Sequence, residues 1–124
     1  MYKILIIEDE VDIAKVLRKR LLEAGYEVFV AHDGYFGTKM AHEKKPDLII
    51  LDLMLPAGHG LLVLKNLRFS MDTSEIPVVV TTGSRDEEYR KKVMEEGIDA
   101  IFDKPFDSEK LLQTIKDILA KKGS

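Results

Sequence analysis

Residues 48–56 read Leu-Ile-Ile-Leu-Asp-Leu-Met-Leu-Pro, and this stretch decides the fold. Apart from Asp52 and the terminating Pro56, its side chains are aliphatic or carry a thioether. A run this short and this apolar is typical of a strand that is covered on both faces, as the strands of parallel sheets are. Aspartate, however, is rarely buried unless it is paired or holds a metal. We therefore predict a buried strand over residues 47–51, followed directly by a carboxylate that needs a polar partner.

The composition is that of one globular domain. The 124 residues are 45% hydrophobic and 33% charged, and no apolar run approaches the roughly 20 residues that span a bilayer. Acids follow the first apolar run at once, which is not the pattern of a secretory signal peptide. The absence of cysteine excludes disulfides and thiolate metal sites. Because the net charge of −3 gives no electrostatic case for nucleic acid, we expect a cytoplasmic protein that binds neither nucleic acid nor membrane.

Apolar runs of strand length alternate with helical patterns along the whole chain. Strands are expected over residues 4–7, 26–31, 47–51, 76–81 and 98–102, and later helices over residues 34–44, 60–68, 86–96 and 108–121. The first helix is marked by Ile13, Val16, Leu17 and Leu21 at helical spacing and closed by Gly25, and Ser108 is expected to cap the last helix. Strictly alternating units imply an α/β fold: a doubly wound, five-stranded parallel sheet, (βα)5, in three layers. We expect a single domain over residues 1–122 and a frayed tail over residues 123–124.

Polar side chains follow four of the five expected strands. Glu8 and Asp9 follow the first strand, Asp52 the third, Thr82 the fourth and Lys104 the fifth. Each has an ordinary explanation by itself: acids suit a helix start, a threonine before glycine suits a turn, and a loop lysine is usually solvated. In open parallel sheets, however, ligands bind outside the carboxyl ends of the strands. The joint occurrence at one edge therefore favours a functional site.

The chemistry of these groups points to phosphoryl acceptance. Three crowded carboxylates raise one another's pKa unless a cation neutralises them. A hard divalent ion such as Mg²⁺ takes oxygen ligands and commonly keeps waters and a phosphate. An aspartate carboxylate is a nucleophile that can form an aspartyl-phosphate, and its phosphoryl oxygens would be stabilised by the metal, the Lys104 ammonium and a hydroxyl such as that of Thr82.

With these residues in view, the sequence resembles the receiver domain of bacterial two-component response regulators, from Lys3 to about Leu119. The motifs that carry the resemblance are Ile7-Glu8-Asp9-Glu10, Leu51-Asp52-Leu53-Met54-Leu55-Pro56 with Gly60, Thr82-Gly83, and Lys104-Pro105-Phe106. The resemblance implies a flavodoxin-like strand order, 2-1-3-4-5. It also implies a phosphorelay switch that takes a phosphoryl group from a histidine kinase or phosphotransfer domain and changes how it binds a downstream protein or output domain.

The resemblance also assigns roles. It makes Asp52 the phosphoacceptor, Asp9 a direct Mg²⁺ ligand, Glu8 a ligand through water, and the Met54 backbone carbonyl the last protein contact of the metal, with Mn²⁺ able to substitute. Thr82 and Lys104 would contact the phosphoryl group, and the Lys104-Pro105 peptide bond would be cis, as is common in the family. Such a protein is not an enzyme acting on other molecules, because it assists only its own phosphorylation and dephosphorylation.

Two departures from the family pattern bear on the switch. Glu8 replaces the more usual aspartate, and Ile101 occupies the place, three residues before the lysine, where the family usually has an aromatic ring. Phe102 is one residue late and by strand alternation faces away from Ile101. We therefore expect a loop and helix adjustment instead of a ring movement, read by partners on the surface formed by residues 86–96, the fifth strand and residues 108–121.

The lifetime of the phosphorylated state is predicted from two flanking residues. Met54 and Ser84, each two residues past a site residue, should flank the path of the attacking water. Met54 is apolar and cannot orient a water, and Ser84 is too short to act as a strong positioning group. A slowly decaying aspartyl-phosphate is expected.

Two other classes of protein remain open at this point. A flavin-binding electron carrier shares the sheet but needs a phosphate-binding loop rich in Ser, Thr and Gly where this chain has Glu8-Asp9-Glu10. An aspartyl-phosphate hydrolase typically has a second acid where this chain has Met54, and no Walker loop occurs. No output domain follows Lys122, so the chain is either a stand-alone receiver or one excised from a longer regulator.

Overall fold

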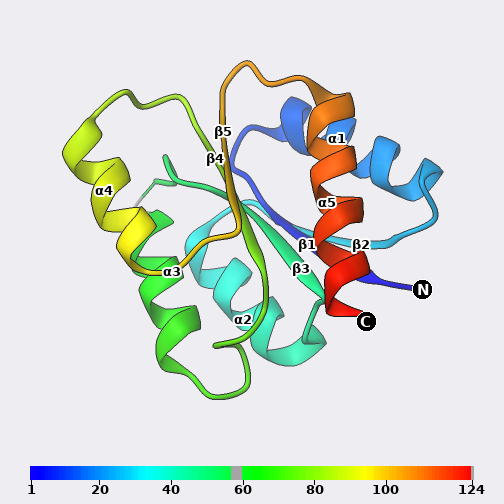
Figure 1. Ribbon diagram of the computed structural model, residues 1–124, viewed down its shortest axis with the longest axis horizontal. Coiled ribbons are helices and arrows are strands. Elements are labelled where there is room, and N and C mark those ends of the chain that lie inside the picture. Colours follow the sequence, from blue (N-terminus) through cyan, green and yellow to red (C-terminus); the bar gives the residue numbers. More distant parts are fainter. Residues whose placement is uncertain (57–59, 124) are drawn as a thin grey trace.

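The computed structural model describes residues 1–56 and 60–123, which form five strands and five helices in strict alternation (Figure 1). In chain order the elements are β1 (Lys3–Ile7), α1 (Val11–Glu23), β2 (Glu27–Ala31), α2 (Gly34–Lys44), β3 (Leu48–Asp52), α3 (Gly60–Phe69), β4 (Val78–Thr82), α4 (Glu87–Glu95), β5 (Ala100–Asp103) and α5 (Ser108–Lys122). Every expected strand and helix is present, with boundaries displaced by at most about two residues.

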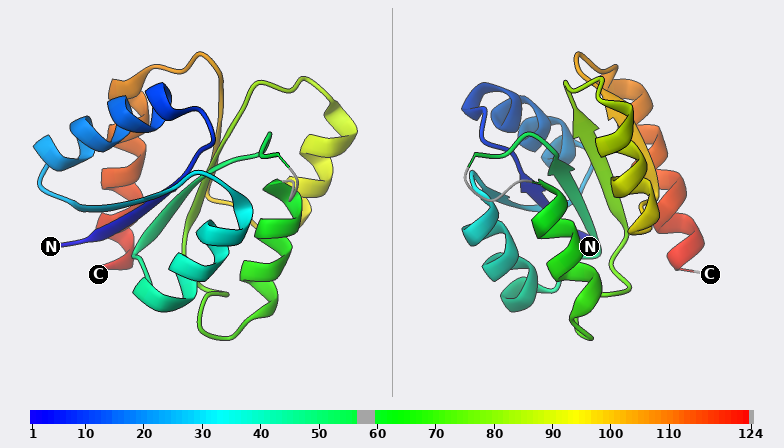
Figure 2. Two further views of the ribbon diagram at one scale, coloured as in Figure 1. Left: turned by 180° about the vertical axis from the view of Figure 1, so that it is seen from behind. Right: turned by 90° about the vertical axis from the view of Figure 1, so that its left-hand side faces the viewer.

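The strands form one parallel sheet in the order β2-β1-β3-β4-β5, which confirms the expected topology. Because the order reverses at β1, the connections place α1 and α5 on one face and α2, α3 and α4 on the other (Figures 1 and 2). The three layers of the predicted doubly wound fold are therefore present.

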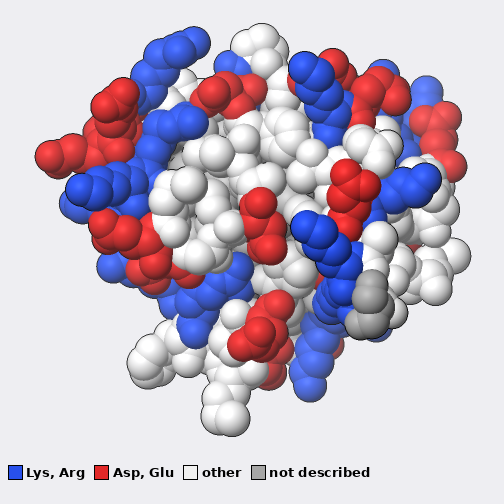
Figure 3. Space-filling view, in the orientation of Figure 1, with Lys and Arg blue, Asp and Glu red and all other residues white. Residues whose placement is uncertain are grey.

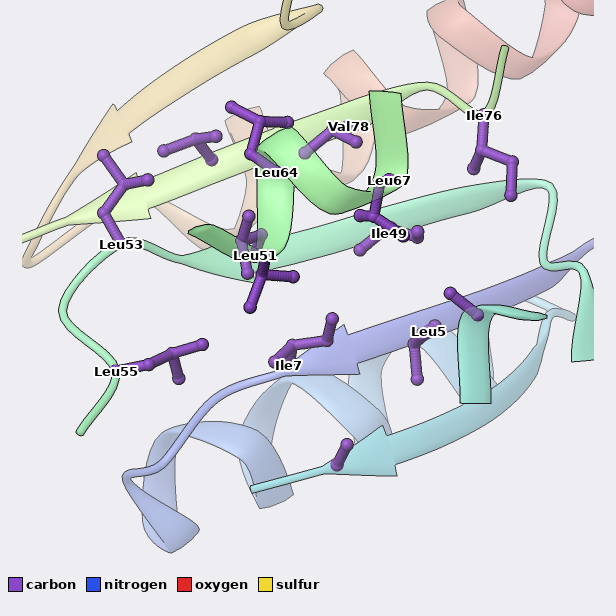
Figure 4. Close-up of a cluster of buried hydrophobic side chains, with 14 of the residues drawn as sticks. Leu5, Ile7, Ile49, Leu51, Leu53, Leu55, Leu64, Leu67, Ile76 and Val78 are labelled. Atoms are coloured by element: carbon purple, nitrogen blue, oxygen red, sulfur yellow. The ribbon is translucent and has the colours of Figure 1, made fainter. Parts of the chain in front are cut away.

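Alternation along the central strands fills both faces of the sheet. Ile49 and Leu51 of β3 belong to the cluster that packs under α3, where Leu64 and Leu67 meet them (Figure 4). The intervening β3 residues belong to the second cluster, which α1 and α5 cover. Burying one such aliphatic side chain contributes about 1.5–3 kcal/mol, so these two clusters supply most of the stabilisation of the fold.

The cap of α5 differs from the sequence prediction. Ser108 is the first residue of the helix, and the N-cap is Asp107, whose carboxylate accepts hydrogen bonds from the backbone N–H groups of Glu109 and Lys110. The prediction of Ser108 as the cap was wrong: Asp107 and Ser108 are adjacent, and aspartate and serine are both favoured at the N-cap position. The carboxylate prevails since it accepts two N–H groups and complements the positive end of the helix dipole.

The ends of α1 and α4 fit their sequence signals. Gly25 and Gly97 have φ of +96° and +84°, the left-handed conformation that glycine adopts most easily after a helix. α5 ends with Gly123 as its C-cap, and Ser124, the other residue of the expected tail, lies outside the described residues. Within the described part of the chain, no helix has the length and apolar character required to cross a membrane.

Candidate functional site

The three predicted carboxylates converge at the carboxyl edge of the sheet. Glu8 follows β1 and Asp52 ends β3, so the pairing of these neighbouring strands places the two side chains together. Oxygen atoms of Glu8, Asp9 and Asp52 all lie within 4.8 Å of one another. Glu8 and Asp52 are each only 2% exposed, which is rare for acids and requires compensation by a cation or hydrogen bonds.

Lys104 supplies a positive charge at the same place. Its Nζ lies 2.9 Å from Glu8 Oε1, 3.3 Å from Asp52 Oδ2 and 3.4 Å from Glu10 Oε2. The lysine follows the end of β5, and its backbone N–H donates to the Thr82 carbonyl at 2.8 Å. The Lys104-Pro105 peptide bond is cis, the isomer predicted from the sequence.

The carboxylates share their charge unevenly. Burial raises the pKa of Glu8 to about 7, with a further contribution from its hydrogen bond with Asp52. Burial also works to raise the pKa of Asp52, but hydrogen bonds with Glu8 and the Met54 N–H, together with the charge of Lys104, lower it below its ordinary value. These contacts favour ionisation of Asp52, which a nucleophile requires, over ionisation of Glu8.

The backbone after β3 is closely packed around the phosphoacceptor candidate. Asp52 Oδ1 accepts the Met54 N–H at 2.9 Å, and the Leu53 carbonyl accepts the Gly60 N–H at 3.1 Å. A Cβ at Gly60 would lie 2.5 Å from the Leu53 Cα and 2.9 Å from the Asp52 carbonyl oxygen, so only glycine fits there. A Cβ at Gly83, on the other side of the site, would meet nothing within 4 Å.

A hollow of about 180 Å³ opens above Asp52, lined by Asp9, Glu10, Asp52, Met54, Gly83 and Lys104. Met54 stands at its rim and is 54% exposed. Thr82 ends β4 and is fully buried, and its Oγ1 accepts the Ser84 N–H at 3.0 Å. The chain therefore brings Glu8, Asp9, Asp52 and Lys104 into contact, with Thr82 at the end of the strand beside β3.

Strand alternation separates Ile101 and Phe102 as predicted. Ile101 packs against the cluster under α3 and α4, whereas Phe102 packs against the cluster under α1 and α5. The sequence prediction missed Tyr89 of α4, which packs beside Ile101's cluster and whose hydroxyl donates to the Leu53 carbonyl at 3.0 Å. Its spacing of four residues from the buried Val93 marks it as facing the core, but nothing in the sequence marks its partner.

The donor set suits a hard divalent cation. Three carboxylates with oxygens this close together are the ligand type that Mg²⁺ prefers, and a single lysine does not neutralise them. On the face of the molecule drawn in Figure 3, by contrast, basic and acidic side chains are interspersed and no continuous basic patch forms.

The sheet order places the chain in the doubly wound class whose ligands bind at the carboxyl edge of the sheet. At this edge lies a cluster of three acids that could hold a metal ion. The family model of the response regulator receiver domain matches residues 4–116, and the chain belongs to this family. Receiver domains are the phosphoacceptor signalling domains of two-component systems and work with histidine kinases and output domains. Family membership also removes the flavin carrier and the hydrolase as alternatives.

Relatives of known identity agree. The chain is 37% identical to the DNA-binding dual master transcriptional regulator RpaA of Synechocystis over 98% of its own length and 50% of that protein. It is 35% identical to the phosphate regulon transcriptional regulatory protein PhoB of Escherichia coli, over 96% of this chain and 52% of that one. Among solved structures, the chemotaxis response regulator CheY4 of Vibrio cholerae matches with a TM-score of 0.88 and 29% identity, covering 95% of this chain and 98% of that one. The chain spans about half the length of the two transcriptional regulators.

Proposed function

We propose that the chain is a phosphorelay switch in which Asp52 accepts a phosphoryl group in a Mg²⁺-dependent reaction. The observation that carries the proposal is the convergence of three carboxylates within 4.8 Å, with the Lys104 ammonium 3.3 Å from Asp52. An ionised aspartate beside a cation, in a hollow open to solvent, is arranged for nucleophilic attack on phosphorus.

The site residues take distinct parts. Asp9 would bind the metal directly, Glu8 would bind it through water, and the Met54 backbone carbonyl would complete the protein ligands; Mn²⁺ has the same ligand preference and would substitute. When bound, the ion neutralises the carboxylates and the phosphoryl oxygens. Lys104 and the Thr82 hydroxyl contact the transferred group, and Lys104 exchanges its ion pair with Glu8 for one with a phosphoryl oxygen.

The transfer balances without any further reactant. A carboxylate oxygen of Asp52 forms a bond to phosphorus as the bond from phosphorus to the donor breaks, and the donor leaves as an imidazole when it is a phosphohistidine. The protein that supplies the phosphoryl group is a histidine kinase or phosphotransfer domain, and a small phosphodonor can replace it in the test tube. Hydrolysis of the acyl phosphate by water later restores the carboxylate, so the chain assists its own phosphorylation and dephosphorylation and acts on no other substrate.

The proposed output surface comprises α4, β5 and α5, which adjoin Thr82 and Lys104. An output domain or a separate downstream protein reads this surface in the cytoplasm, and the domain itself contacts neither nucleic acid nor membrane. The relatives that are named DNA-binding or transcriptional regulators extend over about twice this length, which supports an output function that lies outside the receiver.

The proposal is tested with a radiolabelled small phosphodonor, such as acetyl phosphate, in the presence of Mg²⁺ and in excess chelator. The parent protein should be labelled only with the metal, and Asp52→Asn should lose the label. Asp47→Asn is the matched control, because Asp47 lies at the opposite edge of the sheet, where its carboxylate accepts the Lys3 N–H. Labelling of Asp52→Asn equal to that of the parent would refute the assignment, as would labelling that ignores the chelator.

A further inference from the structure

The N-terminus of α4 is joined to the switch threonine by three consecutive hydrogen bonds. Thr82 Oγ1 accepts the Ser84 N–H at 3.0 Å, and Ser84 Oγ accepts the Asp86 N–H at 3.2 Å. Asp86 is the N-cap of α4, and its carboxylate accepts the Tyr89 N–H at 3.2 Å. The first turn of α4 is therefore linked by hydrogen bonds to the side-chain oxygen of Thr82.

Tyr89 connects the same helical turn to the other side of the site. Its half-buried ring packs against the cluster beneath α3 and α4, and its hydroxyl donates to the Leu53 carbonyl at 3.0 Å and accepts the Leu61 N–H at 3.2 Å. Leu53 directly follows Asp52, and Leu61 lies in the first turn of α3. One side chain of α4 thus holds the backbone beside the phosphoacceptor.

These contacts close a ring. β3 and β4 are paired, with Asp52 opposite Thr81, and the residue that follows each of these, Leu53 and Thr82, is joined to the other through the first turn of α4. Burial raises the pKa of Tyr89, with a smaller contribution from the negative charge of Asp52. The phenol therefore stays protonated and can donate, and its hydroxyl lies in the electric field of the phosphoacceptor.

Ile101 cannot make the hydrogen bond to the Leu53 carbonyl that Tyr89 makes, because its aliphatic side chain on β5 has no hydroxyl. We propose that Tyr89 is the positioning residue that couples the phosphorylation state of Asp52 to α4, through the hydrogen bond from its hydroxyl to the Leu53 carbonyl. The inference rests on the proposed function of Asp52. A phosphoryl group on Asp52 moves the backbone at Leu53 and draws the Thr82 hydroxyl towards it, the Tyr89 bond is released, and α4 shifts.

The test compares the parent with Tyr89→Phe, which keeps the ring and removes only the hydroxyl. Backbone amide shifts are recorded before and after saturation with Mg²⁺ and beryllium fluoride, a phosphoryl mimic. In the parent, the amides of Gly83 and Lys104 and those of residues 90–94 in α4 should all shift. In Tyr89→Phe the shifts at Gly83 and Lys104 should persist, and those over residues 90–94 should fall at least twofold. Tyr35→Phe, at an exposed position of α2, is the matched control and should behave as the parent.

A second readout separates coupling from a merely structural role. If the hydroxyl bond exists in the resting state and is released on activation, its removal favours the activated state, and by linkage the mimic should bind about twofold to tenfold more tightly to Tyr89→Phe. A structural role would destabilise both states alike and leave this affinity unchanged. Unchanged or weaker binding of the mimic, or parent-like shifts in α4, would overturn the inference. If the amides of Gly83 and Lys104 did not shift in the parent itself, the proposed function would be refuted and the coupling with it.

Discussion

At the amino edge of the sheet, Arg68 donates to the carbonyls of Ser74 and Ile76 at 3.1 and 2.8 Å and twice to that of Gly97 at 3.0 and 2.8 Å. At the carboxyl edge, Lys104 lies within 3.4 Å of carboxylate oxygens of Glu8, Glu10 and Asp52. Every Arg68 contact at the amino edge joins segments that the fold must hold together. The charges at the carboxyl edge are held together for a cation and a phosphoryl group that come from outside.

The difference shows how one small sheet separates stability from function. At the amino edge, Arg68 donates charge-assisted hydrogen bonds to three backbone carbonyls, which stabilises the fold directly. At the carboxyl edge, burial raises the pKa of Glu8 to about 7, so keeping this acid ionised costs stability until a cation neutralises it, which is the usual condition of a site selected for chemistry. Substitutions at the two edges should therefore change the free energy of unfolding in opposite directions.

The largest expected effect comes from Arg68→Met. Loss of its charge-assisted hydrogen bonds should lower the free energy of unfolding by about 2–3 kcal/mol and leave labelling of Asp52 intact under conditions where the protein is folded. Glu8→Gln, measured without divalent ions, should leave stability unchanged or raise it, because it removes a buried acid from the cluster. Urea unfolding monitored by circular dichroism measures both. Equal losses of stability in the two variants would break the comparison between the edges.

A smaller effect, on rate, is expected at the rim of the site. Met54 is half exposed beside the hollow above Asp52 and offers no group to orient a water. Ser84, which has a short side chain, follows Gly83 of the lining of this hollow. Met54→Asn should speed loss of the label after donor removal about tenfold, which corresponds to a barrier lower by about 1.4 kcal/mol. Met71→Asn is the control, since Met71 is 95% exposed in the connection between α3 and β4. Decay in Met54→Asn as slow as in the parent would remove Met54 from any gatekeeping role.

The smallest effect concerns pH at the amino edge. The hydrogen bond from His42 to Asp72, at 2.9 Å, raises the pKa of His42 above its ordinary 6.5. A raised folded pKa means that the stabilisation is complete below pH 6.5 and is lost as the pH rises through the folded value. Because both side chains are partly exposed, screening by solvent should keep the contribution of the pair small.

Comparison of the parent with His42→Gln isolates this contribution. Glu8, with a pKa of about 7, titrates in the same window in both proteins and cancels in the difference. The free energy of unfolding of the two should differ most below pH 6.5 and converge at alkaline pH. A gap that stays constant across this range would mean that His42 contributes packing and not charge.

Most of the fold and the site could be predicted because their signals are local. Buried strands such as β3 are indicated by apolar runs, and the carboxyl ends of parallel strands must meet, so the sequence alone places Asp52 and Lys104 together. The strand order came from the family resemblance and not from the residues. The opposite orientations of Ile101 and Phe102 followed from strand alternation alone.

Other features could not be predicted, because local sequence signals fit more than one arrangement of the chain equally well and only the tertiary structure decides between them. Asp107 and Ser108 are adjacent cap residues, and only the path of the backbone decides which one receives the N–H groups. The Tyr89 bond to Leu53 joins residues 36 positions apart in different elements, and periodicity marks one as core-facing without naming its partner. The predicted end of β4 at residue 81 was one residue short, because pairing of Thr82 with Asp103 of β5 extends the strand. Such pairing between distant segments has no local signal in the sequence.

Gly60 and Gly83, the two glycines beside the site, differ in the space available for a side chain. This difference decides where a fluorescent reporter of phosphorylation could be attached. The chain contains no cysteine, so Gly83→Cys would create its sole thiol, at a position with open space that borders the hollow above Asp52. A fluorophore attached there would report on phosphorylation of a single protein species without background labelling. Position 60 offers no such opportunity, because any side chain there would press on the backbone that carries Asp52 and make the reporter perturb the event it is meant to record.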